Sequence, residues 1–163
     1  MKMFWSYSRR DDQPPLNKVS SLRKSFETAL SQAIGEDCEI FFDLDSIKWG
    51  SIWRNEIDRR IVECDCLVAI VTPSYFNSRM CVYELNQACS ENKKILPIYF
   101  RECKTLKSTF KEDGLEGEVN QKLNKASLQI SEAQMKDFRG LRNLNLDSRE
   151  VQDFLDIIAG DIA

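Results

Sequence analysis

Glu84 is the acidic residue of this chain whose position best suits chemistry. A helix is predicted to begin at Arg79, and Glu84 lies at the edge of an apolar stripe on it, formed by Cys81, Leu85, Ala88 and Cys89. This helix closely follows the apolar run Cys66–Val71, whose length and β-branched residues predict a strand buried on both faces. Open α/β sheets bind their ligands beyond the carboxyl ends of such strands. Glu84 is therefore a candidate functional carboxylate; the alternative is an ordinary solvated helix residue.

The chain contains no histidine, which removes several kinds of site. Ser-His-Asp and Cys-His arrangements are impossible within it, as is any zinc site that needs imidazole. The six cysteines form no CxxC pair. Because several of them lie in apolar runs, we expect reduced, buried thiols. The chemistry that remains is that of carboxylates, hydroxyls, thiols, lysine and arginine.

Strand and helix patterns alternate along the chain, which predicts a parallel sheet with helices on both faces. Strands are expected at residues 3–8, 39–43, 66–71 and 94–100, with a last short one within 138–146; helices are expected at 16–34, 51–63, 79–92 and, after a capping box at 147–150, to about 159. Residues 101–134 predict only a loop with one or two short helices. Right-handed crossovers and the chain length favour an α/β flavodoxin-like three-layer sandwich with five strands in the order 2-1-3-4-5.

That strand order brings residues 8–9, the loop 43–50 and the turn 72–74 to one rim, with Glu84 directly behind them. In the helix expected at 51–63, four large residues should point inward: Ile52, Trp53, Ile57 and Ile61. Pro97 cannot donate to a strand ladder, which predicts an edge-ward or bulged position for it.

Composition and missing motifs exclude several functions. At 163 residues, 42% hydrophobic and 30% charged, the chain fits one ordinary globular domain. A net charge of −3 without a dense basic run argues against nucleic acid as partner. No apolar stretch of membrane-spanning length and no signal-peptide pattern occur, so we expect no membrane contact and a cytoplasmic location. The first predicted turn, Ser8–Asp11, has no glycine for a dinucleotide fingerprint, no P-loop occurs, and Val71-Thr72-Pro73 lacks the aspartate of a phosphate-receiver domain.

Three separated blocks resemble the TIR (Toll/interleukin-1 receptor) domain family, particularly its bacterial members. They are Phe4–Asp11, the stretch from Phe42-Asp43 through Trp49-Gly50 to Trp53, which is similar to the family's BB loop, and Thr72 through Ser78, Cys81 and Glu84-Leu85. The resemblance implies one TIR domain over residues 1–163. It also allows that the chain is cut from a longer one with a C-terminal sensor domain.

Many TIR domains hydrolyse NAD+, and the resemblance assigns their catalytic glutamate to Glu84. NAD+ is then the substrate, and no cofactor is implied. The nicotinamide leaves as a neutral molecule from a cationic pyridinium, so a single carboxylate can suffice where glycosidases use two. Substrate contacts are expected from Tyr7, Ser8, Arg9, Asp45, Trp49, Gly50 and Met80; the alternatives are a solvated turn residue for Arg9, local hydrogen bonding for Asp45 and a packed loop aromatic for Trp49. Met80 stands where the family usually has tryptophan, and Trp49 or Trp53 would supply the missing aromatic face.

Alternatives to the hydrolase remain open from the sequence. One is a cyclase that makes cyclic ADP-ribose, and another is a non-catalytic adaptor that works through homotypic TIR contacts. The resemblance further implies activation by self-association and a role as an NAD-depleting effector in bacterial anti-phage defence. A fused or separate nucleotide-sensing domain, including STING-like ones, is the expected partner.

Overall fold

A five-stranded, fully parallel sheet organises the chain, and its strand order is β2-β1-β3-β4-β5. The computed structural model describes residues 1–42 and 52–163. The strands are β1 Lys2–Ser6, β2 Glu39–Phe42, β3 Cys66–Val71, β4 Lys94–Tyr99 and β5 Lys136–Asp137. The helices are α1 Lys18–Ile34, α2 Trp53–Glu63, α3 Pro73–Asn77, α4 Arg79–Ser90, α5 Gly117–Glu132 and α6 Arg149–Gly160, with short 3-10 turns η1 Arg9–Asp11 and η3 Lys104–Lys107. The predicted flavodoxin-like architecture and strand order are confirmed.

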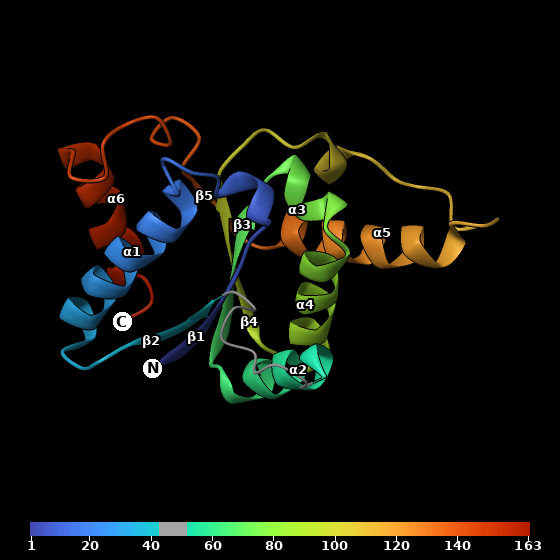
Figure 1. The fold of residues 1–163 in the computed structure, drawn as a ribbon, viewed down its shortest axis with the longest axis horizontal. Helices are drawn as coiled ribbons and strands as arrows, with labels where there is room; N and C mark the ends of the chain where they lie inside the picture. The colour runs from blue at the N-terminus through green and yellow to red at the C-terminus, as the bar shows by residue number, and fades with distance from the viewer. Residues whose placement is uncertain (43–51) are drawn as a thin grey trace.

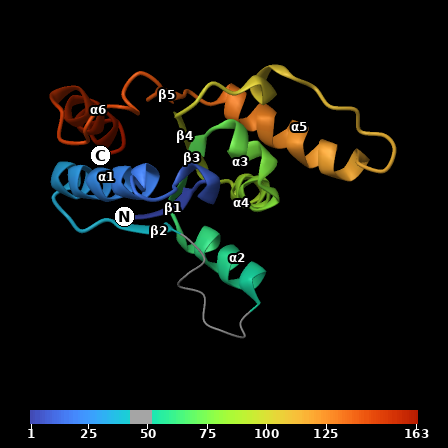
Figure 2. The same cartoon turned by 45° about the horizontal axis from the view of Figure 1, so that its top comes forward.

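Helices cover both faces of the sheet, as Figures 1 and 2 show. Alternate residues of β1 serve the two faces: Met3 and Trp5 pack with α1 and α6, whereas Phe4 packs with α2, α3 and α4. All six residues of β3 are buried, as predicted for the central strand. The molecule therefore has two apolar cores, one on each side of β3.

The end of β3 is fixed by helix caps. The Thr72 hydroxyl accepts a hydrogen bond from the Tyr75 amide at 3.0 Å and so caps α3, a short helix that the sequence did not predict. The Ser78 hydroxyl accepts one from the Cys81 amide at 3.3 Å and caps α4. Because caps fix where a helix begins, these two side chains determine how α4 presents Glu84.

The last strand differs from its prediction. β5 contains only Lys136–Asp137 and precedes the segment 138–146, which forms turns instead. The apolar pattern of that segment has another cause: Phe138 is stacked on Phe100, with 5.6 Å between ring centroids, and packs against Phe154 of α6. β5 pairs only with Ile98 and Tyr99 of β4. At Pro97, β4 is therefore paired with β3 on one side and has no β5 partner on the other.

Three further details correct the sequence predictions. Residues 117–132 form one helix of 16 residues, α5, and not a short one. Ser148 begins α6 without a side-chain cap bond, so 147–150 is no capping box. Ile52 and Trp53 are 65% and 38% exposed, because the chain only enters α2 at Trp53 and that ring packs edge-on against Tyr83 at the surface.

The cysteines are reduced, as their apolar surroundings predicted. All six cysteines are free; five are buried and Cys89 is half-buried. Burial raises the pKa of the Cys66 thiol to about 12. Within residues 1–42 and 52–163, no helix has the length and apolarity needed to cross a bilayer.

The inward face of α2 can be tested with two neighbouring residues. Ile61 is fully buried, whereas Val62 is 53% exposed. We expect Ile61→Ala to lower the free energy of unfolding by about 2–5 kcal/mol, because it leaves a cavity in the apolar core that α2 shares with β1 and α4. Val62→Ala, the matched control, should change it by less than about 0.5 kcal/mol. Urea unfolding followed by circular dichroism measures both, and equal effects would contradict the assignment of the two faces.

Candidate active site

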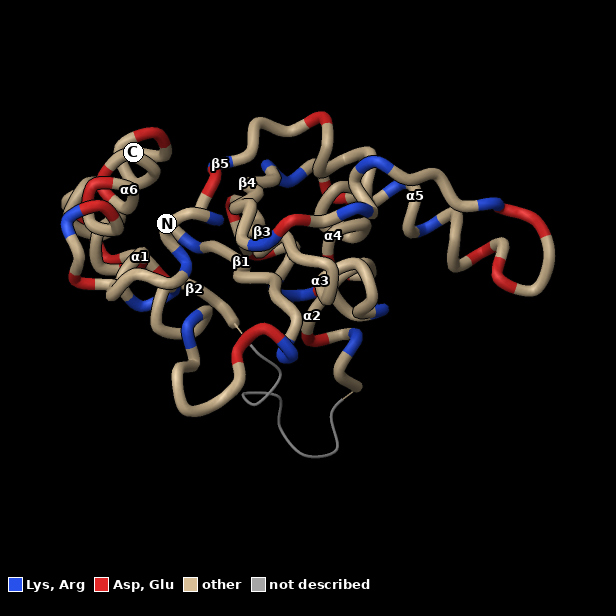
Figure 3. Tube along the Cα trace, turned by 90° about the horizontal axis from the view of Figure 1, so that it is seen from above, with Lys and Arg blue, Asp and Glu red and all other residues tan. Residues whose placement is uncertain are grey.

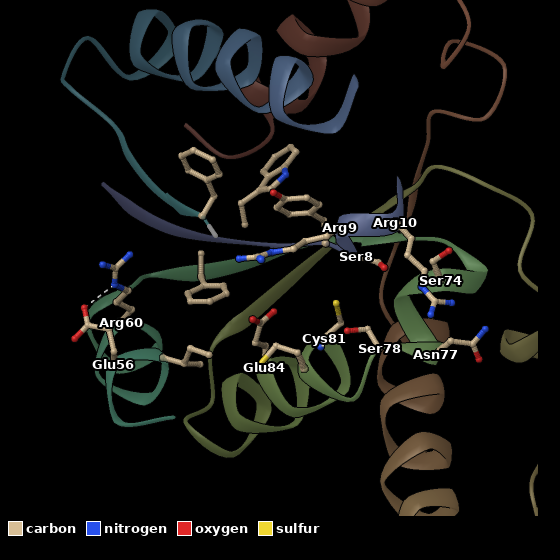
Figure 4. Close-up of a pocket in the computed structure, with 16 residues that line it drawn as sticks. Ser8, Arg9, Arg10, Glu56, Arg60, Ser74, Asn77, Ser78, Cys81 and Glu84 are labelled. Carbon is tan, nitrogen blue, oxygen red and sulfur yellow. Dashed lines mark hydrogen bonds and ion pairs between the residues drawn. The ribbon is translucent and has the colours of Figure 1, made fainter. Parts of the chain in front are cut away.

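A cavity of about 400 Å³ lies at the carboxyl rim of the sheet, where the ends of β1 and β2 meet α2, α3 and α4. Figure 4 shows its lining. The lining residues are Phe4, Trp5, Tyr7, Ser8, Arg9, Arg10, Phe42, Glu56, Ile57, Arg60, Ser74, Asn77, Ser78, Met80, Cys81 and Glu84. The cavity thus combines aromatic walls with two carboxylates and three guanidinium groups.

Glu84 points from α4 into this cavity and is only 7% exposed (Figure 4). Behind it, the fully buried Ser6 hydroxyl donates a hydrogen bond of 2.6 Å to Glu84 Oε2. The Tyr75 hydroxyl lies 3.0 Å from the same Ser6 oxygen. Since the Ser6 proton is directed to the carboxylate, Tyr75 must donate its own proton to Ser6. This chain of buried groups fixes the orientation of the Glu84 carboxylate.

The turn after β1 supplies the opposite wall of the cavity. Ser8 is buried, and Arg9 extends across the cavity on the side opposite α4 (Figure 4). The turn is anchored by Asp11, whose side chain is 6% exposed and accepts a hydrogen bond of 2.6 Å from the Thr72 hydroxyl. Arg101, just after β4, lies 3.7 Å from the same carboxylate. Asp11 therefore ties the Arg9 turn to the ends of β3 and β4.

Cys81 lies beside Glu84 but is no candidate nucleophile. Burial, and next the negative charge of Glu84, raise the pKa of its thiol well above the usual range. The thiol therefore stays protonated at neutral pH, whereas nucleophilic cysteines need the thiolate. Met80, one helical turn before Glu84, is half-buried and forms an apolar part of the wall.

An ion-pair cluster on α2 closes the far side of the cavity. The Glu56 carboxylate lies 2.8 Å from Arg60 Nε and 2.7 Å from Arg59. These hydrogen bonds, to Arg59 first and then to Arg60, lower the pKa of Glu56 to about 2. Glu56 is therefore ionised at neutral pH, and its charge is already balanced by arginine. The Glu56–Arg60 pair therefore does not provide a second free carboxylate opposite Glu84.

Five of the eight predicted site residues line the same cavity: Tyr7, Ser8, Arg9, Met80 and Glu84. The other three, Asp45, Trp49 and Gly50, lie outside the described residues, so their predicted roles stay predictions. Sequence reasoning missed Ser6, Glu56 and Arg60. The spacing of Glu56 and Arg60, four apart on one helix, was the available signal for that pair. A single serine in a strand carried none. Among the residues that the structure describes, no group of acidic and thiol side chains is arranged to hold a metal ion.

The fold and the cavity together define a flavodoxin-like α/β domain with a buried carboxylate at the carboxyl rim. The profile of the TIR domain family matches residues 4–142. The chain therefore belongs to the TIR domain family, as its sequence blocks indicated.

Two solved structures illustrate the likeness. The TIR domains in the structure of the activated Roq1 resistosome, which directly recognises the pathogen effector XopQ, superpose with a TM-score of 0.65 at 18% identity, covering 99% of both chains. The TIR domain of the Toll-related receptor TRR-2 from Hydra magnipapillata gives 0.47 at 15% identity, covering 80% of this chain and 98% of that one. No curated protein sequence matches significantly. At 18% identity, the Roq1 likeness supports the fold.

The α2 ion pairs predict a specific pH dependence of stability. The folded-state pKa of Glu56 lies below its ordinary value of 4.5, at about 2. The stabilisation by this carboxylate is therefore present above its unfolded pKa and is lost as pH falls toward the folded one. We expect Glu56→Gln to lower stability at about pH 7 and to differ progressively less from wild type toward about pH 3.

Urea unfolding across this pH range measures the difference. The control is Glu91→Gln, a change at an exposed position just after α4. It should give a small difference that is independent of pH, and the same constant difference for Glu56→Gln would contradict the prediction.

Proposed function

We propose that this TIR domain cleaves the bond between nicotinamide and ribose in NAD+, with Glu84 as the catalytic carboxylate. The observation that carries the proposal is the burial of Glu84 at a cavity wall with its orientation fixed by Ser6. Polar groups that are buried and preoriented at a cavity are characteristic of catalytic sites. Membership of the TIR family adds the expected substrate.

The chemistry needs one anion and no general acid. The bond between C1′ of the ribose and the pyridinium nitrogen breaks, and its electron pair stays on nicotinamide, which leaves neutral. The ribose becomes electron-poor at C1′, and the ionised Glu84 stabilises this oxocarbenium-like state and accepts hydrogen bonds from ribose hydroxyls. Water then adds to C1′ and loses a proton, which gives ADP-ribose. Glycosidases need a second carboxylate to protonate their leaving group, and this reaction does not.

The other cavity residues fit supporting roles. Arg9 brings a positive charge that suits the substrate diphosphate, and Tyr7 and Ser8 bring hydroxyls for ribose or phosphate. Met80 supplies an apolar surface for a ring, without the aromatic stacking of tryptophan. Asp45, Trp49 and Gly50 belong to the proposal as a loop that covers the bound base.

Self-association belongs to the same proposal. The Roq1 TIR domains were solved within an activated resistosome, and we propose that this chain, too, is activated by assembly. In the proposed assembly of this chain, the segment of one copy that contains Asp45, Trp49 and Gly50 would close on Glu84 of the next copy. The biological role that we propose is an NAD-depleting effector of bacterial anti-phage defence, governed by a nucleotide-sensing domain.

Glu84→Gln is the decisive substitution. It keeps the size of the side chain and the hydrogen bond to Ser6 but removes the charge, so we expect nicotinamide release to fall by about 10²-fold or more. Purified protein is incubated with NAD+ at low and at high protein concentration, and nicotinamide, ADP-ribose and cyclic ADP-ribose are quantified by chromatography.

Glu91→Gln, the same change at an exposed position after α4, should leave the rate unaltered. Wild type that releases no more nicotinamide at high concentration than Glu84→Gln would refute the enzyme and leave the adaptor. A cyclic product would identify the cyclase.

Ser6 gives a second, separate prediction. Its hydroxyl lies behind Glu84 and does not line the cavity. Ser6→Ala should therefore lower kcat by about tenfold, which corresponds to about 1.4 kcal/mol, while KM changes little. Tyr75→Phe removes the hydroxyl one step further away and should act in the same direction but more weakly. A change confined to KM would show that Ser6 acts on substrate binding instead.

A further inference from the structure

A second groove lies beside the candidate active site, on the side of α1 and α6. It has a volume of about 840 Å³ and runs between the start of α1, the end of β4 and the turns at 142–147. Five cationic side chains line it, against two acidic ones: Arg10, Lys18, Lys24, Arg101 and Arg142, with Asp11 and Asp147. Leu16 and Leu144, which are 77% and 36% exposed, add apolar surface to it. We call this surface the basic groove.

Most of the positive charge in the basic groove is not balanced within the domain. Within the described part of the chain, the side chains of Arg10, Lys24 and Arg142 make no ion pair or hydrogen bond. Asp11 is already engaged by Thr72 and Arg101. Burial lowers the pKa of Lys18, which donates a hydrogen bond to the Leu144 carbonyl and so joins the two walls of the groove. The groove therefore has a fixed shape and uncompensated charge.

The opposite charge is concentrated at the far end of α5. Residues 108–118, which we call the acidic arm, carry four carboxylates and one lysine. The arm projects from the body of the domain (Figure 1), and Figure 3 shows its acidic residues in red. Leu115 at its tip is fully exposed, at 108% of the reference area. A contact with another molecule that covered Leu115 would remove this apolar surface from water.

The acidic arm is braced in one conformation. Asn124 of α5 donates to the Phe110 carbonyl at 2.7 Å and accepts from the Phe110 amide at 2.9 Å, and Asn120 donates to the Lys111 carbonyl at 2.7 Å. A side chain at Gly117 would stand 2.4 Å from the Glu112 carbonyl oxygen, so only glycine permits the turn. Because the arm is already ordered, a contact through it requires little further loss of conformational entropy.

We propose that the acidic arm of one copy of this chain docks in the basic groove of a second copy. The exposed carboxylates of Asp113 and Glu116 would meet the unpaired cations, and Leu115 would lie against Leu16 and Leu144. Complementary charge favours this placement of the arm in the groove and disfavours placements that bring like charges together. The two surfaces lie on different parts of the domain, so each contact joins unlike surfaces of the two copies.

This inference rests on the self-association part of the proposed function and names its surfaces. Arg10 lines both the basic groove and the cavity that holds Glu84. An arm docked in the groove would therefore contact the turn that carries Arg9 and Arg10. In this way assembly would act directly on one wall of the candidate active site.

Charge reversal and charge exchange test the contact. Sedimentation equilibrium of the Glu84→Gln variant measures association without turnover of NAD+. Lys24→Glu/Arg142→Glu in the groove, or Asp113→Lys/Glu116→Lys in the arm, should each weaken association by at least about tenfold. Mixing the two doubly reversed chains should restore association, because the new arm and the new groove are again complementary. Leu115→Ser should weaken it without any change of charge.

The control is Lys2→Glu/Lys94→Glu, at the amino ends of β1 and β4. It changes the net charge by the same amount as the groove variant Lys24→Glu/Arg142→Glu. It should associate as wild type does, and thermal unfolding verifies that every variant is folded. The inference would be overturned if neither charge-reversed variant associated more weakly than the parent protein. It would also be overturned if the chain stayed monomeric while its basic groove bound inorganic pyrophosphate. Either result leaves the NAD+ cleavage assay, and with it the proposed catalysis, to stand on its own.

Discussion

A carboxylate taken out of water must find hydrogen-bond donors inside the protein, and this requirement explains how the rim of the sheet is built. Glu84 is 7% exposed, and an unpaired ion at such a position would cost several kcal/mol. The Ser6 hydroxyl, at the end of β1, donates a hydrogen bond of 2.6 Å to this carboxylate, and the Tyr75 hydroxyl from α3 contacts Ser6 in turn. Because these groups come from three elements, their hydrogen bonds join β1, α3 and α4 at this point. The cavity beside Glu84 is the space that their convergence leaves.

At the end of β3, the Thr72 side chain makes two hydrogen bonds that link separate elements. Thr72 accepts from the Tyr75 amide and donates to Asp11, so the start of α3 and the turn after β1 are coupled through a single buried hydroxyl. Tyr75 in turn reaches Ser6. The two walls of the cavity, the Arg9 turn and the α4 surface, are therefore not independent.

The parts of the structure that could be predicted are those in which a local pattern has one physical solution. The run Cys66–Val71 can be satisfied only by burial on both faces, and alternation of strands and helices then leads to the sheet order. The place of Glu84 was predictable because helical spacing puts it at the edge of an apolar stripe just beyond that strand, whereas Met80 was expected at the site through the family resemblance. β5 was not, since two residues paired to the end of β4 carry no pattern, and Phe138 was apolar for packing against Phe100. Ser6 could not be found either, because its role depends on α4, which lies 78 positions along the chain.

The buried carboxylate also weighs on the choice between an enzyme and a purely adhesive domain. Adhesion needs surfaces, and the acidic arm and the basic groove would provide them, with Arg10 as the one lining residue that the groove shares with the cavity. Nothing in adhesion calls for an ion at the back of a cavity, where an apolar residue of similar volume would pack at no electrostatic cost. A glutamate kept there, with a serine and a tyrosine arranged behind it, suits a site in which a positive charge develops in front of the carboxylate, as the proposed cleavage of NAD+ requires. A ribose that is losing nicotinamide is such a charge, and Arg10, shared by the cavity and the groove, is where association and that chemistry would meet.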